Sequence, residues 1–125
     1  MNRYVIESWL LLLRFEFLIL FGEFKDLHGL VAKQRARAIP LAKRHSAGRL
    51  CYALDYACVF YFKRVLCLQR SAAATLLLRR HGWSAEMVLG AQMLPFKSHA
   101  WVEVDGIVVN DKPYMLEIYQ VLERC

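Results

Sequence analysis

The sequence predicts an α+β domain in which helices come first and a small antiparallel sheet follows. Up to about residue 82 the apolar residues form long runs suited to helices, and from residue 85 onward the runs are short. Two of the short runs flank Asp105-Gly106, a dipeptide typical of hairpin turns. The change of pattern therefore places the helical half before the sheet.

The composition describes one globular domain. The 125 residues are 58% hydrophobic and 22% charged, which excludes a disordered chain, a collagen-like repeat and a coiled coil. A domain of this length buries roughly two-thirds of the surface that its unfolded chain exposes, so a real core is available. We expect residues 1–125 to form a single domain.

The first predicted element is a nearly buried helix over residues 5–24. Four charges, Glu7, Arg14, Glu16 and Glu23, interrupt its apolar run. Each central charge costs about 2.5 to 3.5 kcal/mol on membrane-insertion scales, so we do not expect the helix to span a bilayer. The interrupted run does not fit a secretory signal either. Packing on the domain or on a partner is the main prediction, and peripheral membrane contact is the alternative.

A basic stretch follows this helix and is interpreted as a short helix plus a connecting loop. Gly29, Pro40 and Gly48 punctuate it. Its basic residues are Lys33, Arg35, Arg37, Lys43, Arg44 and Arg49.

Two further helices are expected after this connector. Residues 50–65 carry apolar side chains on nearly every face with Asp55 as the one early charge, which indicates a buried helix. Residues 71–80 are rich in Ala and Leu and end in two arginines, with Gly82 just beyond as a stop signal.

The predicted sheet follows from residue 85 onward. Its short apolar runs cover residues 86–91, 98–104, 107–111 and a last element near 115–122.

Charge and cysteine content limit the function classes. Between residues 27 and 85 there are eleven basic residues and one acidic residue, whereas both flanks are slightly acidic. No nucleic-acid-binding signature accompanies this basic region, so a solvated face or a peptide or protein partner is favoured over nucleic acid. None of the four cysteines has C-x-x-C spacing, which predicts reduced thiols, an intracellular protein, and neither metal nor cofactor.

Cys67 is the candidate nucleophile. It lies directly before the helix predicted over residues 71–80, where the positive end of the helix dipole favours a thiolate. Arg70 adds a cation one turn further on. Cys51 and Cys58 lie in an apolar helix and are interpreted as small core residues, and Cys125 is terminal.

His99 and Asp111 are the candidate partners of that thiol. A cysteine nucleophile needs an imidazole to accept and return its proton, and the imidazole needs a carboxylate to fix its tautomer. His99 lies on one predicted strand and Asp111 on the next. The other histidines, His28, His45 and His81, are expected at the surface.

The register of the hairpin tests this pairing. A two-residue loop at Asp105-Gly106 places His99 opposite Lys112, with Asp111 on the other face of the sheet. A three-residue loop, residues 104–106 with a G1 bulge at Gly106, places His99 directly opposite Asp111. The candidate triad therefore predicts the three-residue loop.

Two ordered motifs carry a family resemblance. CLQRS opens a helix, and HAWVEVDGIVVNDKP follows about thirty residues later. Over roughly residues 50–113 the chain resembles the transglutaminase-like cysteine peptidases of lasso-peptide biosynthesis, which remove the leader from a precursor peptide. The resemblance implies a papain-like α+β fold in which residues 50–125 form the catalytic core, preceded by a helical region and connector over residues 1–49.

The resemblance also implies site residues and partners. The family's catalytic Cys, His and Asp fall on Cys67, His99 and Asp111, while Arg70 is expected near the thiolate or a substrate carbonyl and Ser71 on a backbone group. Only about 50 residues precede the matching region, which resembles the split form of the family. That form implies a separate winged-helix protein that holds the leader, a precursor with leader and core, and a macrolactam cyclase that closes the product, all in the cytoplasm.

Three functions remain open at this point. The first is leader removal by thiol acylation and hydrolysis. The second is transglutaminase-type amide transfer, because the same triad serves both reactions. The third is a non-catalytic subunit that binds the leader. The backbone N–H of Cys67 is the predicted oxyanion donor, and the sequence identifies no second donor.

Overall fold

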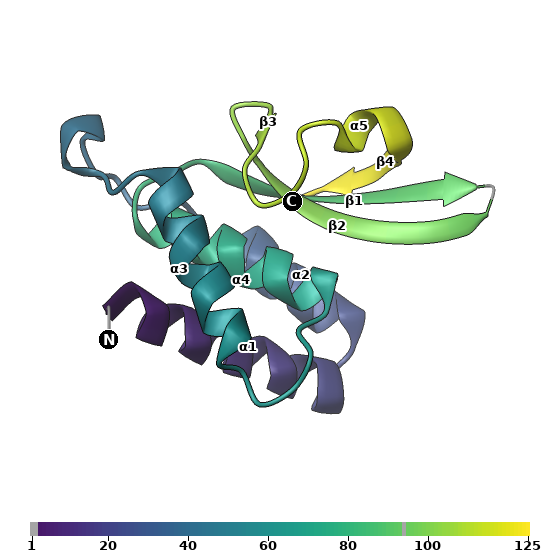
Figure 1. The fold of residues 1–125 in the computed structure, drawn as a ribbon, viewed down its shortest axis with the longest axis horizontal. Coiled ribbons are helices and arrows are strands. Elements are labelled where there is room, and N and C mark those ends of the chain that lie inside the picture. The colour runs from purple at the N-terminus through teal and green to yellow at the C-terminus, as the bar shows by residue number, and fades with distance from the viewer. Residues whose placement is uncertain (1–2, 94) are drawn as a thin grey trace.

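The computed structural model describes residues 3–93 and 95–125 and has two layers, with helices below a sheet in the view of Figure 1. The helical elements are α1 (Arg3–Phe21), α2 (Phe24–Lys33), the 3-10 helix η1 (Leu41–Lys43), α3 (Ala47–Val59), α4 (Cys67–Arg80) and the one-turn helix α5 (Met115–Ile118). The strands are β1 (Ala85–Met93), β2 (Phe96–Val104), β3 (Ile107–Val108) and β4 (Gln120–Arg124). The predicted α+β class is confirmed.

Helix α4 lies at the centre of the domain, in contact with α1, α2, α3, β1 and β2. Ala72, Ala73 and Ala74 are buried, and these small side chains let neighbouring elements approach closely. The helix ends where predicted, because Gly82 adopts a positive φ of 97° and the Trp83 N–H bonds to the Leu78 carbonyl at 2.9 Å. This is the Schellman arrangement that glycine permits.

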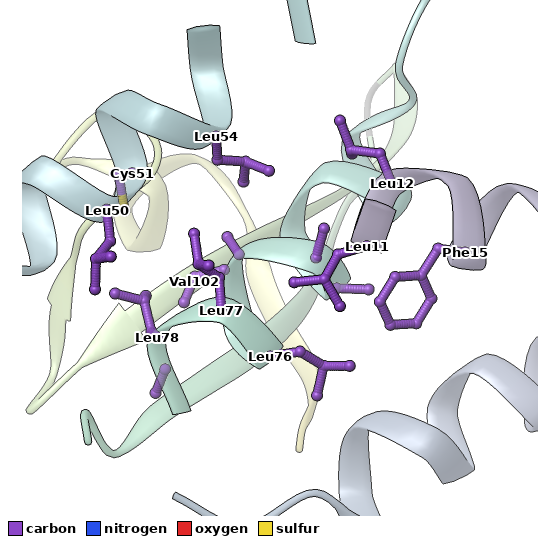
Figure 2. Close-up of a cluster of buried hydrophobic side chains, with 14 of the residues drawn as sticks. Leu11, Leu12, Phe15, Leu50, Cys51, Leu54, Leu76, Leu77, Leu78 and Val102 are labelled. Atoms are coloured by element: carbon purple, nitrogen blue, oxygen red, sulfur yellow. The ribbon is translucent and has the colours of Figure 1, made fainter. Parts of the chain in front are cut away.

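The main core lies between α4, its neighbouring helices and one face of the sheet, as Figure 2 shows. Leucines of α4 interleave with side chains from α1, α3 and β2; the labelled set is Leu11, Leu12, Phe15, Leu50, Cys51, Leu54, Leu76, Leu77, Leu78 and Val102. Cys51 is a core residue, as its apolar surroundings in the sequence indicated.

Helix α1 buries one face and exposes the other. Leu12 and Phe15 are fully buried, whereas Leu10, Phe17 and Leu20 are more than half exposed. It ends at Phe21, three residues before the predicted end, and α2 follows directly. No helix in the described part of the chain is long and apolar enough to cross a membrane.

The sheet is antiparallel, with strand order β3-β2-β1-β4. Its second face carries a smaller cluster formed by Val88, Trp101 and Met115. The predicted last element over residues 115–122 is in fact two elements, α5 and β4.

The hairpin between β2 and β3 differs from the prediction. Glu103 pairs with Val108 and Val104 with Ile107, so the loop is the two-residue Asp105-Gly106. Both loop residues have positive φ, 53° and 79°, which fits the type I′ turn preferred in tight hairpins. The predicted three-residue loop is therefore wrong.

His99 and Asp111 meet despite this register because the ladder is short. The Val109 N–H still donates to the Val102 carbonyl, but the Val102 N–H donates to the side-chain Oδ1 of Asn110, at 2.7 Å. The chain leaves the strand there, so the alternation of side chains along a strand no longer determines on which face of the sheet Asp111 lies.

The boundaries of two helices also differ from the sequence-based prediction. Helix α3 ends at Val59, six residues before the predicted end, and residues 61–66 form an irregular link. Helix α4 begins at Cys67, four residues earlier than predicted, so Cys67 is itself helical.

Candidate functional site

Cys67 is the first residue of α4 and is exposed. Leu66 before it is extended, with φ −76° and ψ 153°, and its carbonyl accepts the Arg70 N–H at 2.9 Å as the helix begins. The first N–H groups of a helix have no partner within it, and the dipole there is positive. Cys67 therefore lies exposed at the partly positive end of α4.

His99 and Asp111 are joined directly. The His99 Nε2 and Asp111 Oδ2 atoms are 2.5 Å apart, and the Lys112 N–H donates to Asp111 Oδ1 at 2.8 Å. Burial raises the pKa of Asp111, but the bond with His99, the Lys112 N–H and the charge of Arg70 outweigh it and hold that pKa below its ordinary value. The carboxylate is thus ionised, and His99 Nδ1 is the ring nitrogen left for another partner.

Aromatic packing fixes the plane of the His99 ring. Its centroid lies 5.4 Å from that of Tyr119 and 6.2 Å from that of Trp101, with interplanar angles of 24° and 25°. Gly90 makes room for this packing, since a Cβ there would lie 2.7 Å from a Trp101 ring carbon.

A cavity of about 230 Å³ joins the thiol and the imidazole. Its lining is mostly apolar and comprises Cys67, Leu68, Leu89, Gly90, Ser98, His99, Ala100 and Leu122. Within residues 3–93 and 95–125 no hydrogen bond links Cys67 to His99, so the shared cavity is what relates them. Catalytic hydrogen bonds are often long without substrate, so this arrangement is compatible with a thiol–imidazole pair.

A buried polar link holds α4 against β2 beside this cavity. Ser71 Oγ donates to the Ala100 carbonyl at 2.9 Å, and Asn110 Nδ2 donates to Ser71 Oγ at 3.3 Å. Asn110 also accepts from the Val102 N–H. The helix turn after Cys67 is therefore tied to the backbone of the residue after His99.

Comparison with known proteins identifies the family of the chain. Residues 10–124 match the sequence profile described as the Transglutaminase-like superfamily. The chain belongs to this superfamily. No solved structure matches the chain.

A curated relative of the transglutaminase-like chain supports the narrower resemblance. The Microcin J25-processing protein McjB of Escherichia coli is 41% identical over 56 residues, which cover 45% of this chain and 27% of that protein. The chain thus matches about a quarter of the relative's length. The family resemblance based on the two ordered motifs is confirmed.

Arg70 of this transglutaminase-like domain pairs with Asp55, and its expected place near the thiolate or a substrate carbonyl stays a prediction. Its Nε and Nη2 atoms donate to Asp55 Oδ1 at 3.0 and 2.6 Å, which ties α4 to α3. After the bonds from His99 and Lys112, the charge of Arg70 makes a smaller contribution to lowering the pKa of Asp111.

Gln69 points away from the cavity. Its amide donates to the Leu12 carbonyl at 2.8 Å and to Glu16 at 3.3 Å. Tyr61 also donates to Glu16, and burial together with that carboxylate raises the pKa of Tyr61 to about 12. Gln69 and Tyr61 therefore help to satisfy a buried glutamate on α1.

The remaining candidate histidines are half-buried, not surface residues. His28 lies 2.8 Å from Glu123, and His81 lies 2.9 Å from Glu7. His45 bonds to the Tyr4 hydroxyl. None of the three lines the cavity at Cys67.

Three residues that contribute to the site were missed in the sequence. No sequence pattern around Tyr119 indicates that it packs on His99. Gly90 is an isolated glycine inside a strand, a pattern that marks close approach. Asn110 precedes Asp111, and its polar side chain beside an apolar run was a usable signal.

Proposed function

We propose that this protein is a cysteine peptidase that removes the leader from a lasso-peptide precursor. The observation that carries the proposal is the cavity shared by Cys67 and His99, with Asp111 bonded to His99 Nε2 at 2.5 Å. The identity to a protein named for processing microcin J25 supports the substrate class.

In the first step the Cys67 sulfur attacks the carbonyl carbon at the junction of leader and core. His99 accepts the thiol proton at Nδ1, and the Asp111 carboxylate stabilises the imidazolium. The new S–C bond forms as the C–N bond breaks, and His99 returns the proton to the departing amine of the core. The leader is then held as a thioester on Cys67.

In the second step water hydrolyses that thioester. His99 takes a proton from the water, the hydroxide oxygen bonds to the carbonyl carbon, and the thiolate leaves. The leader departs with a free carboxylate. The Cys67 backbone N–H, which has no partner in the helix, is positioned to bind the oxyanion in both steps.

The same proposal includes partners. A separate winged-helix protein would hold the leader, and a macrolactam cyclase would use the freed amine of the core, in the cytoplasm. The exposed apolar face of α1 offers an interface for a partner or for peripheral membrane contact.

Cys67→Ala tests the proposal. The variant, the precursor and the leader-binding protein are incubated together, and leader release is measured by mass spectrometry. Loss of the nucleophile should lower the cleavage rate by at least about 10³-fold, as with other covalent catalysts. Cys58→Ala is the matched control, because that half-buried thiol lies outside the cavity and its loss should leave cleavage unchanged.

The same assay separates the alternatives. Unchanged processing by the Cys67→Ala variant would assign a non-catalytic role. In ¹⁸O-labelled water, hydrolysis places heavy oxygen in the leader carboxylate, whereas amide transfer to an added amine does not.

A further inference from the structure

A second cavity lies at the opposite end of α4 from Cys67. It has a volume of about 370 Å³ and is bounded by the start of α1, the chain after α2 and the end of α4. Its lining includes four arginines, Arg3, Arg35, Arg37 and Arg80, together with His81 and Glu7. We refer to this cavity as the arginine pocket.

In the part of the chain that the structure describes, the guanidinium groups of the arginine pocket lack carboxylate partners. Glu7 is the acidic side chain in its lining, and Oε1 of Glu7 lies 2.9 Å from His81 Nε2. Among the residues that the structure describes, no carboxylate oxygen lies within 4.0 Å of these four guanidinium groups. Uncompensated like charges in one cavity create a field that attracts an anion.

Buried contacts hold this pocket in shape. Arg79 is buried beside it and donates from Nε to the Ala85 carbonyl at 2.9 Å and from Nη1 to the Gln34 carbonyl at 3.0 Å. The Arg37 N–H in turn donates to the Arg79 carbonyl at 2.8 Å. The segment that carries Arg35 and Arg37 is thus anchored to Arg79, near the end of α4, at both Gln34 and Arg37.

The spread of the guanidinium groups favours a peptide with several carboxylates over one compact anion. The guanidinium groups come from three separate segments, so they suit several single charges spread along a chain. Guanidinium and carboxylate groups pair well through two parallel hydrogen bonds.

We propose that the arginine pocket binds an acidic peptide segment, which, on the proposed function, belongs to the precursor's leader or to the protein that holds it. Helix α4 has 14 residues and is about 20 Å long, so the ligand binds well away from Cys67 and takes no part in bond cleavage. The pocket would anchor the substrate complex while the reacting bond lies at Cys67.

Binding of a fluorescent hexaglutamate peptide to the full-length protein, followed by anisotropy, tests the proposal. Arg35→Glu/Arg37→Glu should weaken binding at least tenfold, and added salt should weaken binding to the wild type. The control is Lys43→Glu/Arg49→Glu, which makes the same charge change at exposed residues of η1 and α3 outside the pocket. Circular dichroism checks that each variant is folded.

Competition identifies the source of the acidic segment. Displacement of the probe by the precursor assigns it to the leader, and displacement by the leader-binding protein alone assigns it to that partner. Equal weakening by the control pair, displacement by neither protein, or tighter binding of inorganic tripolyphosphate would overturn the proposal. Because the assay involves no cleavage, its outcome is independent of whether Cys67→Ala abolishes processing.

Discussion

The two ends of α4 have different chemistry, although one continuous helix supplies both. At its first residue, Cys67 opens onto a mostly apolar cavity shared with His99. At its last turn, Arg80 contributes to a larger cavity lined by arginines. The first end is tied to the sheet through Ser71, and the second to the connector through the buried Arg79.

The difference between these ends follows the direction of the helix. The positive N-terminal end favours a thiolate, and the negative C-terminal end favours cations. Cys67 and the arginines therefore each lie at the end where the dipole stabilises the charge of that group. On the proposals made above, one helix would keep cleavage and substrate anchoring about 20 Å apart.

Among these predictions, the largest change in activity should come from Asp111→Asn. This substitution alters the site at the N-terminal end of α4 and leaves the arginine pocket unchanged. The amide still bonds to His99, but it favours the wrong tautomer and does not stabilise the imidazolium. We expect kcat for leader removal to fall by about 10² to 10⁴-fold. Single-turnover cleavage kinetics measure the change.

Asp105→Asn is the matched control for this variant. Asp105 is exposed in the hairpin turn, and asparagine tolerates its positive φ of 53°. Its activity should equal that of the wild type. Full activity in Asp111→Asn would instead leave Cys67 and His99 acting as a pair.

The sequence predicted the parts that depend on residue type and local signals. Gly82 defined the end of α4, because a positive φ there needs glycine. The order of helices and strands followed from apolar run lengths. Cys67, His99 and Asp111 were selected because nucleophile, base and carboxylate must occur together.

The parts it did not predict depend on tertiary packing. Both hairpin loops were compatible with Asp105-Gly106, and the pairing of His99 with Asp111 arose from the chain leaving the ladder at Asn110. The engagement of Arg70 by Asp55 required the packing of α3 on α4. No local pattern encodes those contacts.

Thiol reactivity provides a second test of the N-terminal end. Burial, with a contribution from Asp55, raises the pKa of Cys51 to about 11, and burial also raises the pKa values of Cys58 and Cys125. At neutral pH about one Cys51 in 10⁴ is a thiolate. Cys67 is exposed at a helix N-terminus, so iodoacetamide should alkylate it before the other three thiols and about 100-fold or more faster than Cys51.

Peptide mass mapping after brief alkylation measures this order. The Cys67→Ala variant should lose the fast phase and keep the slow ones. Labelling of Cys51 or Cys58 before Cys67 would contradict the assignment of Cys67 as the activated thiol.

The smallest expected effect concerns stability and compares the two ends of α4 directly. Asn110 is 6% exposed, and Asn110→Ala removes both its bond to Ser71 and the acceptor for the Val102 N–H. A buried donor left without a partner costs about 1 to 3 kcal/mol, so the free energy of unfolding should fall by that amount.

Arg80→Ala is the comparison at the other end of α4. It removes a half-buried cation that has no carboxylate partner in the described chain, together with a weak interaction with the helix dipole. The free energy of unfolding should fall by less than about 1 kcal/mol. Urea unfolding of both variants measures the difference, and an equal loss in the two would show that the polar link at Ser71 does not distinguish the N-terminal end.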